Sequence, residues 1–369
     1  MDLPKIKIPW WKPQVGSLVE YKLLAQVLKN NYPNQGPLTR QLEQTLAKLL
    51  GVKYVNMTTS GTAALVLALK AAGVGKGDEI IVPDIAFIAA GNAANLCGAK
   101  VVLADVDPQT LTLSPEAFRK AITKRTKAVI PVHISGRGAD MKSILSVAHK
   151  NNVVVIEDSA EAFMSKHRGK FLGTFGKAGC FSLSGLKTIT SGQGGFVVTN
   201  DKKIYQQILF LKNQGVAGIA TGGNDFHPRV GYNFRYTDLQ AALALGQLQR
   251  LPKRLARMKR TNDLYRKHLR NTPGITVLPF DTKKGEVPQW TDVLADRRIE
   301  LEKYLRQQGI ECRNFWFPMH AHVPYKKSAR LFPVSTKLNP KALWLPSAFT
   351  LTDSEILTVI KEIKKFYSR

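Results

Sequence analysis

Short apolar runs alternate with amphipathic segments along the first two thirds of the chain. The runs DEIIVP (78–83), KAVIPVH (127–133) and VVVIEDS (153–159) are nearly continuous in apolar residues, which is typical of strands buried on both faces. Helices are predicted between such runs, for example in TAALVLALKAAG (62–73) and DMKSILSVAHKNN (140–152). Repeated βα units of this kind predict a mainly parallel, doubly wound sheet.

The two ends of the chain depart from this alternation. Residues 1–35 predict an arm with one helix that ends in the turn signal NNYPNQGP, and LTRQLEQTLAKLLG predicts an amphipathic helix closed by its final glycine. In the last third, a long basic helix is expected from about 237 to 270, followed by a shorter α/β section. We therefore expect a large domain over residues 1–250 and a small C-terminal domain over residues 251–369.

Composition places the chain among ordinary globular proteins, with 44% hydrophobic residues and no apolar run long enough to span a bilayer. The start, MDLPKIKIPWWKPQ, has charges and prolines where a signal peptide needs its hydrophobic stretch, so we expect a cytoplasmic protein. Cys97, Cys180 and Cys312 are widely spaced and form no CxxC pair. This pattern argues against a disulfide framework and a zinc site, and no metal is expected.

The net charge is unusually positive, because 54 Lys and Arg face 27 Asp and Glu, a formal charge of +27. Such a field favours anionic partners such as nucleotides, nucleic acid or acidic membranes. The basic residues are scattered, however, and their densest run (253–270) also carries Leu255, Met258, Tyr265 and Leu269 at helical spacing. We interpret this run as a solvated helix face, in preference to a nucleic-acid patch.

Several predicted strands end in residues that carry chemistry, at the sheet edge where open α/β folds bind ligands. Ser60, Gly61 and Thr62 open a helix whose free N–H groups and dipole can hold a phosphate, although the same residues also suit an ordinary N-cap. Asp158 ends a very apolar strand, where it can pair with a cationic ring nitrogen or cap the next helix. Phe87 can cover a flat ring or belong to the core.

Lys187 lies in CFSLSGLKTITSGQGGF (180–196), between two predicted strands and directly before a glycine-rich turn. Taken alone, it suits a surface lysine in a loop. Beside a phosphate cradle, an aromatic lid and a strand-end aspartate, it fits pyridoxal phosphate (PLP) chemistry, in which a lysine forms a Schiff base with the cofactor aldehyde. An aspartate such as Asp158 keeps the pyridine nitrogen protonated. Lys187 is therefore predicted to anchor the cofactor and then to act as acid and base.

These residues recur in order in a known family. The chain resembles the DegT/DnrJ/EryC1/StrS sugar aminotransferases over nearly its whole length, in the blocks SGTAALVLAL, GKGDEIIVP, GAKVVLADVD, VIEDSAEAF, FSLSGLKTITSGQGG, GYNFRYTDLQAALALGQL and LWLPSAFTLT. The segment GLKTIT is similar to the perosamine-synthase-like branch. The resemblance implies the aspartate-aminotransferase-like fold type I, an α/β fold with a mainly parallel seven-stranded sheet and a smaller C-terminal α/β domain.

The resemblance also implies roles for individual residues. Lys187 corresponds to the catalytic lysine, Glu161 to a position near the cofactor's ring hydroxyl, and Asn233 to an asparagine that reaches the phosphate from the neighbouring subunit. At FWFPMH (315–320), where the family has FFxPLH, His320 is a substrate-side candidate, as is Arg313 just before this segment, with a structural role left open for each. The implied cofactor site comprises Gly61, Thr62, Phe87, Asp158, Glu161, Ser182, Lys187 and Asn233.

The implied activity is a PLP-dependent transfer of an amino group from an amino acid, with glutamate expected, to a keto-sugar nucleotide, with a 4-keto-6-deoxyhexose preferred. Family members with histidine in place of the lysine act as dehydratases, so Lys187 favours transamination. The family also implies an obligate homodimer with shared active sites. Alternatives are an aminotransferase acting on a cyclitol or another keto substrate, and a non-catalytic regulatory or nucleic-acid-binding protein on the same fold. Gln193 stands where the family usually has Glu, and Ala86 where it has Thr or Ser.

Overall fold

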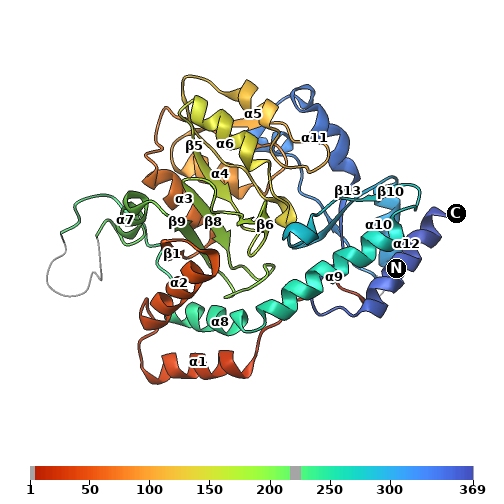
Figure 1. Cartoon of the computed structure of the whole chain (residues 1–369), viewed down its shortest axis with the longest axis horizontal. Helices are drawn as coiled ribbons and strands as arrows, with labels where there is room; N and C mark the ends of the chain where they lie inside the picture. Colours follow the sequence, from red (N-terminus) through yellow and green to blue (C-terminus); the bar gives the residue numbers. More distant parts are fainter. Residues whose placement is uncertain (1–4, 217–225, 369) are drawn as a thin grey trace.

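The computed structural model describes residues 5–216 and 226–368, and a twisted sheet between helices forms its main body (Figure 1). The strands of this sheet are β1 (Tyr54–Thr58), β2 (Glu79–Pro83), β3 (Lys100–Ala104), β4 (Thr126–Val129), β5 (Val154–Asp158), β8 (Ala178–Ser182) and β9 (Gly195–Thr199). Within the described ranges these seven strands follow the order β1-β9-β8-β5-β4-β2-β3. β9 is antiparallel to both of its neighbours, and the other neighbouring pairs are parallel. The predicted mainly parallel seven-stranded sheet is confirmed.

Helices cover both faces of the large sheet because successive strand residues point to opposite sides. Ile80 and Val82 of β2 pack in one core cluster with helices α3, α4 and α7, whereas Ile81 packs in another with α5 and α6. The helices around this sheet are α1 (Leu18–Lys29), α2 (Pro37–Leu50), α3 (Gly61–Ala71), α4 (Ala89–Leu96), α5 (Pro115–Ala121), α6 (Met141–Lys150), α7 (Lys202–Leu211) and α8 (Asp238–Leu248). The predicted arm helix is α1, and α2 ends at Gly51 in the left-handed conformation, as its sequence indicates.

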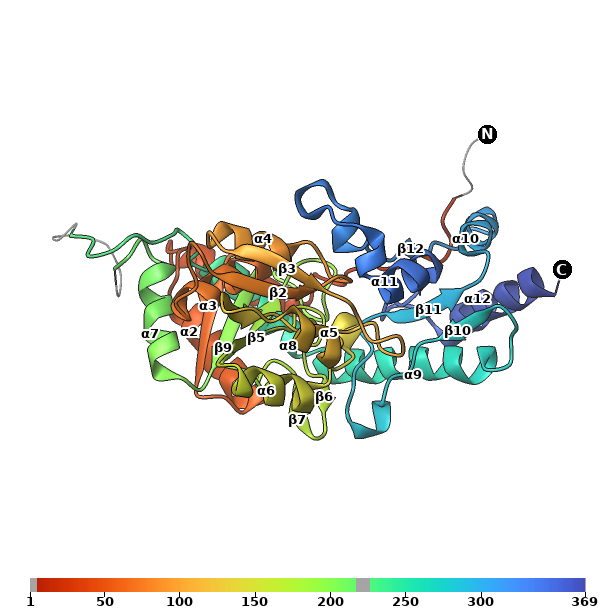
Figure 2. The ribbon, with the colours of Figure 1, turned by 90° about the horizontal axis from the view of Figure 1, so that it is seen from above.

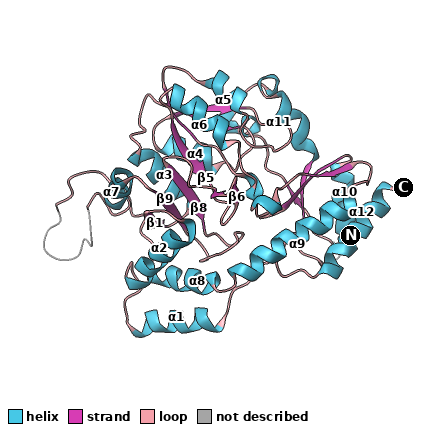
Figure 3. Ribbon diagram, viewed as in Figure 1, coloured by secondary structure: helices cyan, strands magenta, loops and turns pink. Residues whose placement is uncertain are grey.

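A smaller antiparallel sheet lies beside the large one (Figures 2 and 3). Its strands are β10 (Ile275–Val277), β11 (Thr291–Ala295), β12 (Arg313–Asn314) and β13 (Ala342–Leu345), in the order β10-β11-β13-β12. The C-terminal helices are α9 (Leu251–Leu269), α10 (Arg298–Gln307), α11 (Pro333–Leu338) and α12 (Asp353–Tyr367). A separate short hairpin, between β5 and β8 in the chain, pairs β6 (Lys166–His167) with β7 (Lys170–Phe171). The small sheet shares a hydrophobic core with α9, α10 and α12. The division of the chain between residues 250 and 251 stays a prediction.

The predicted continuous helix from 237 to 270 is wrong, because the structure has two helices, α8 and α9, in this segment. Pro252, in the first turn of α9, has no N–H to donate to the carbonyl of Leu248, where α8 ends. Within α9 the predicted apolar stripe is buried at Met258, Tyr265 and Leu269. Except for the buried Arg254, the basic run therefore lies mainly on the outer side of a helix that packs on the small sheet.

The N-terminal arm follows the small sheet before it reaches α1. Ile8 forms a bridge with Ile310, and the carbonyl of Trp10 accepts a hydrogen bond from the N–H of Ser347 at 3.0 Å. α1 then packs on α8 beneath the large sheet (Figure 1). The arm thus runs from the small-sheet side of the molecule to the helices that pack on the large sheet. Over residues 5–216 and 226–368, no helix has the length and apolarity to cross a membrane.

Candidate active site

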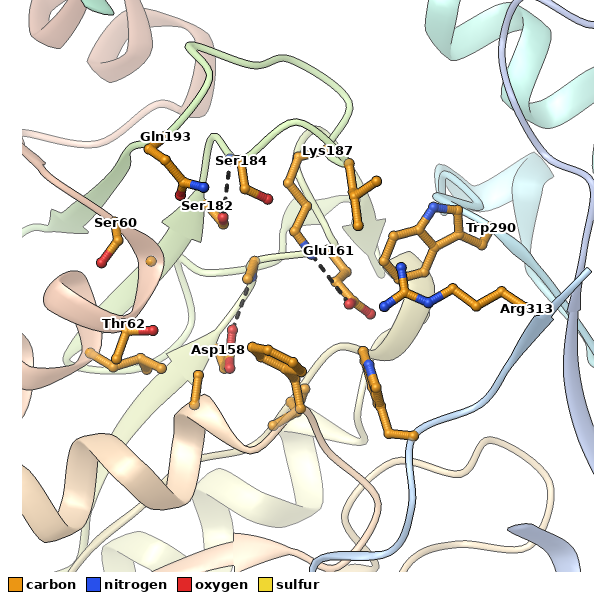
Figure 4. Close-up of a pocket in the computed structure, with 18 residues that line it drawn as sticks. Ser60, Thr62, Asp158, Glu161, Ser182, Ser184, Lys187, Gln193, Trp290 and Arg313 are labelled. Carbon is orange, nitrogen blue, oxygen red and sulfur yellow. Dashed lines mark hydrogen bonds and ion pairs between the residues drawn. The ribbon is translucent and has the colours of Figure 1, made fainter. Parts of the chain in front are cut away.

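A cavity of about 300 Å³ lies at the carboxyl ends of β1, β2, β5 and β8, where they face the small sheet (Figure 4). The large sheet contributes residues that follow these strands, and Trp290, Arg313 and Trp316 close the cavity from the opposite side. The sequence-predicted residues at this cavity are Gly61, Thr62, Phe87, Asp158, Glu161, Ser182, Lys187 and Arg313. Chain segments far apart in sequence therefore meet here because parallel strands present their carboxyl ends at one edge.

The start of α3 forms one end of the cavity. Ser60 is the N-cap and its hydroxyl accepts a hydrogen bond from the N–H of Ala63 at 3.0 Å. The N–H groups of Gly61 and Thr62 belong to the first turn, where no preceding helical carbonyl exists to accept them. A Cβ on Gly61 would lie 3.0 Å from the Cβ of Ser182, closer than most such contacts, so a larger residue would have to push the helix start and β8 slightly apart.

Asp158 lies at the end of β5 with only 6% of its surface exposed. One carboxylate oxygen accepts the N–H of Ala160 at 3.0 Å, and within the described chain no hydrogen bond reaches the other. Burial raises the pKa of Asp158, and the charges of Lys187 and His133 offset only part of that effect. A buried carboxylate with a free oxygen at a cavity is well suited to bind a cationic or N–H-bearing group there.

Lys187 reaches the cavity from the loop between β8 and β9 (Figure 4). Its Nζ lies 3.3 Å from Oε1 of Glu161 and 5.0 Å from the centroid of the Trp290 ring. The other oxygen of Glu161 accepts the N–H of Ser135 at 2.9 Å. Burial raises the pKa of Glu161 to about 7, against the opposing effects of Lys187 and of the Ser135 N–H.

Ser135 has a left-handed backbone (φ 52°) in the turn after β4, which aims its N–H at Glu161. Sequence reasoning missed Ser135, Trp290 and Trp316 as parts of the site. Ser135 and Trp290 were not singled out by any motif and reach the site through long-range folding, whereas Trp316 belongs to FWFPMH, the segment in which His320 was chosen instead. Phe87, in contrast, was predicted, and it lies beside Trp316 with ring centroids 6.1 Å apart.

Two of the sequence-predicted residues lie away from the cavity. Asn233 is exposed, and its side-chain oxygen accepts a hydrogen bond from Arg235 at 3.4 Å. His320 is buried outside the cavity, where its Nδ1 lies 2.7 Å from an oxygen of Asp84. Ser335 donates to the same Asp84 oxygen at 2.5 Å, so this cluster fastens α11 to the end of β2. The contacts of His320 are thus structural within this chain.

Arg313, the other substrate-side candidate, extends into the cavity from β12 (Figure 4). Its guanidinium lies 4.8 Å from the ring centroid of Trp10 and 5.7 Å from that of Trp344. The aromatic faces hold the cation without neutralising it. A positive charge is therefore available to an anionic ligand on the small-sheet side of the cavity.

The donor set fits PLP. The helix start at Gly61 suits a phosphate, the free oxygen of Asp158 suits a protonated ring nitrogen, and the amine of Lys187 suits an aldehyde. An open α/β sheet with these groups at the carboxyl ends of its strands defines the class of fold-type I PLP enzymes.

Comparison with known proteins gives the family. The chain belongs to the DegT/DnrJ/EryC1/StrS aminotransferase family, which it matches over residues 18–364. It is 35% identical to the GDP-perosamine synthase of Escherichia coli O157:H7 over 91% of this chain and 92% of that protein. It is 37% identical to the GDP-perosamine synthase of Caulobacter vibrioides over 87% of each chain.

The fold agrees with a solved structure of DesI determined in the presence of its TDP-sugar product. The TM-score is 0.90 at 28% identity, over 100% of this chain and 94% of that one. The protein is accordingly a PLP-dependent sugar aminotransferase, as its family resemblance implied. The family does not by itself identify the sugar or the role of each residue.

Proposed function

We propose that this enzyme transfers an amino group from an amino acid, with glutamate the expected donor, to the keto carbon of a nucleotide-bound 4-keto-6-deoxyhexose. The proposal rests on the similarity to two GDP-perosamine synthases over most of each chain. The observation that carries it is the convergence of Lys187, Asp158 and the α3 start on one cavity. The cytoplasmic location stays a prediction.

The residues of the large sheet hold the cofactor in this proposal. The N–H groups of Gly61 and Thr62, with the hydroxyl of Ser182, bind the phosphate. Asp158 pairs with the ring nitrogen, and Phe87 covers the ring face. When bound, PLP supplies an electron sink for the charge that develops as a proton leaves the amino acid.

Lys187 performs the proton transfers. Its amine takes the proton from the α-carbon of the donor and returns a proton at the cofactor carbon that carries the new amino group. Glu161 holds this amine by the 3.3 Å contact and keeps it on one side of the cavity. The raised pKa of Glu161 lets the carboxyl exist in both protonation states near neutral pH, so it can adjust to the charge of Lys187.

Arg313 binds the carboxylate of the amino-acid donor. A guanidinium can donate two parallel hydrogen bonds to a carboxylate, and the indole rings of Trp10 and Trp344 lie 4.8 and 5.7 Å from that of Arg313. In this proposal His320 does not contact the substrate, because its imidazole is hydrogen-bonded to Asp84 outside the cavity.

A homodimer with shared sites completes the proposal. Asn233 is exposed in this chain, and Val230 nearby is 85% exposed. Other large apolar side chains are also open to solvent in the single chain, among them Leu18, Tyr21 and Phe226. We assign these exposed apolar groups to the contact surface between the two subunits. We place Asn233 at the phosphate of the neighbouring subunit.

The test begins with a visible absorption spectrum of the purified protein with PLP, followed by glutamate and then by candidate keto-sugar nucleotides. Wild-type protein is expected to form a coloured complex that glutamate bleaches, and a 4-keto-6-deoxyhexose nucleotide is expected to restore the colour. Lys187→Ala serves as the matched control and forms no such complex. Restoration only by a cyclitol-type ketone would overturn the substrate assignment, and absence of any coloured complex would overturn the role of Lys187.

A further inference from the structure

The loop that carries Lys187 is held by side chains from three distant segments. This loop joins β8 to β9 and has little regular structure of its own, so its backbone polar groups need other partners. Three of its carbonyl oxygens accept side-chain hydrogen bonds: Gly185 from Trp11 Nε1 at 3.3 Å, Leu186 from Gln289 Nε2 at 2.9 Å, and Thr188 from Arg254 Nη1 at 3.0 Å. Residues immediately before and after Lys187 are therefore fixed from outside the loop.

Gln289 makes the most specific of these contacts. Its amide nitrogen donates to the carbonyl of Leu186, and its amide oxygen accepts the hydroxyl of Thr188 at 2.7 Å. One buried side chain, 1% exposed, thus contacts both residues that flank Lys187. An amide side chain offers a donor and an acceptor in one plane, so a single residue can serve both contacts.

The same residue is connected to the partner of Lys187. The backbone N–H of Gln289 donates to the carbonyl of Ser135 at 2.7 Å, and the N–H of Ser135 donates to Glu161. Glu161 in turn contacts the amine of Lys187. The contacts form a closed circuit that fixes both the backbone and the amine of Lys187 relative to Glu161.

We propose that Gln289 is a positioning residue for Lys187. Its hydrogen bonds hold the loop that carries Lys187 in a fixed position relative to Ser135 and Glu161. The inference rests on the proposed role of Lys187 and extends it to a residue outside the cavity lining. Gln289 lies two residues before β11, so the small-sheet side of the molecule sets the placement of a lysine carried by the large sheet. A displacement of a reacting group by about 1 Å can cost about 10²-fold in rate, so loss of this contact acts on the chemical step.

The test compares Gln289→Leu and Thr188→Val with a matched control, Tyr265→Phe. Gln289→Leu keeps the bulk and removes both hydrogen bonds, whereas Thr188→Val removes the hydroxyl bond and leaves Gln289 in place. Tyr265→Phe removes one fully buried hydrogen bond, from the hydroxyl to the carbonyl of Pro346 at 3.0 Å, outside the loop. Amide hydrogen exchange of the PLP-free protein gives a readout that needs neither cofactor nor substrate.

The amides of Lys187 and Ser191 report on the loop, because they donate to Ser184 and Leu183 within it. Their exchange is expected to accelerate about tenfold in Thr188→Val, which loses one hydrogen bond, and at least about tenfold in Gln289→Leu, which loses two. In PLP-loaded protein, the maximal rate of bleaching by glutamate is expected to fall by about 10²-fold in Gln289→Leu. The glutamate concentration for half-maximal rate should stay within about threefold, since the donor-binding groups are untouched.

Exchange and bleaching rates in Gln289→Leu and Thr188→Val that match those of Tyr265→Phe would overturn the inference. If Gln289→Leu does not fold, Thr188→Val decides by the same two readouts. If wild-type protein shows no bleaching at all, the proposed function fails, and the exchange of the Lys187 and Ser191 amides still decides whether Gln289 orders the loop.

Discussion

The side-chain amine of Lys187 lies 3.3 Å from Glu161 Oε1, with only 14% of the lysine side chain and 5% of the glutamate side chain exposed. Burying such an ion pair costs desolvation free energy, so a buried pair next to a cavity indicates that its charges serve a function. Burial raises the pKa of Glu161 to about 7, so the protonation of this carboxyl changes in the range where the enzyme is expected to work.

The first prediction concerns the stability of PLP-free protein against pH. The pKa of Glu161 in the folded chain, about 7, lies above its ordinary value of 4.5, so the folded state binds the proton more tightly than the unfolded state. The contribution to the free energy of unfolding is therefore fully present below the ordinary pKa and is lost as pH rises toward 7, by at most about 3 kcal/mol.

Denaturant unfolding of wild-type protein and Glu161→Gln at several pH values measures this effect. The variant should lack that part of the pH dependence, so its stability relative to wild type increases as pH rises through this window. Groups that do not interact with Glu161 titrate alike in both proteins and cancel in the comparison, whereas Asp158, whose charge adds to the raised pKa of Glu161, cancels only in part. Parallel pH profiles for the two proteins would contradict the prediction.

A second prediction separates stability from function at Asp158. The substitution Asp158→Asn keeps the shape and an acceptor for the Ala160 N–H, and it removes a carboxylate whose pKa is raised by burial. PLP-free Asp158→Asn should be at least as stable as wild type near neutral pH, because the desolvation cost of the charge is gone. The rate of bleaching by glutamate should fall by about 10²-fold or more, because the ring nitrogen loses its anionic partner. A variant with wild-type rate would refute the pairing.

The third prediction concerns the close approach of Gly61 to Ser182. A Cβ at Gly61 would lie 3.0 Å from Ser182 Cβ and 3.4 Å from its hydroxyl oxygen, so Gly61→Ala should disturb the phosphate end. PLP affinity is expected to fall by about tenfold or more, the value of one charge-assisted hydrogen bond. Titration with PLP measures it, and Gly75→Ala is the control because a Cβ there meets nothing within 4 Å. Equal affinities in the two variants would remove Gly61 from the phosphate site.

The fourth prediction tests Arg313 as the anchor of the donor carboxylate. Arg313→Leu should raise the KM for glutamate by about tenfold or more, with PLP affinity unchanged. Arg313→Lys should recover only part of that loss, because an ammonium cannot form the two-pronged pair. Steady-state kinetics with varied glutamate measures both. An unchanged KM for glutamate, with a raised KM for the keto sugar, would assign Arg313 to the other substrate.

Much of the fold could be predicted because its signals are local. Nearly continuous apolar runs identified β2 and β5 as strands buried on both faces, and the alternation with helices indicated the parallel sheet. The prediction of one continuous helix from 237 to 270 was wrong because it followed the apolar periodicity alone. Pro252 lacks an N–H and interrupts the helical hydrogen bonds between α8 and α9.

The site residues likewise differ in whether a local sequence signal marks them. Lys187, Asp158 and Gly61 could be found because each lies at or after the end of a strand and belongs to a recognisable block. Gln289 and Trp290 could not, because they come from a segment without a motif and reach the lysine only through tertiary contacts. Long-range positioning of this kind has no counterpart in local sequence pattern.

The last prediction tests whether Asn233 acts across a dimer interface. Its exposure in the single chain leaves two possibilities, a site in the same subunit or one in the neighbour. Asn233→Asp places a negative charge where the phosphate is expected, so it should inactivate whichever site it serves. Lys187→Ala inactivates its own subunit's site.

Heterodimers purified through two different tags distinguish the possibilities. If Asn233 serves the neighbour, a heterodimer of Lys187→Ala with Asn233→Asp has one intact site and about half of the wild-type activity per dimer. A heterodimer of wild type with the double variant then has none, because the wild-type lysine receives the aspartate from its partner. Service within one subunit would reverse the two results, since the single variants would leave no intact site while the wild-type subunit would keep its own. Either pattern requires that the heterodimer stay associated during the assay, which size-exclusion chromatography at the assay concentration verifies.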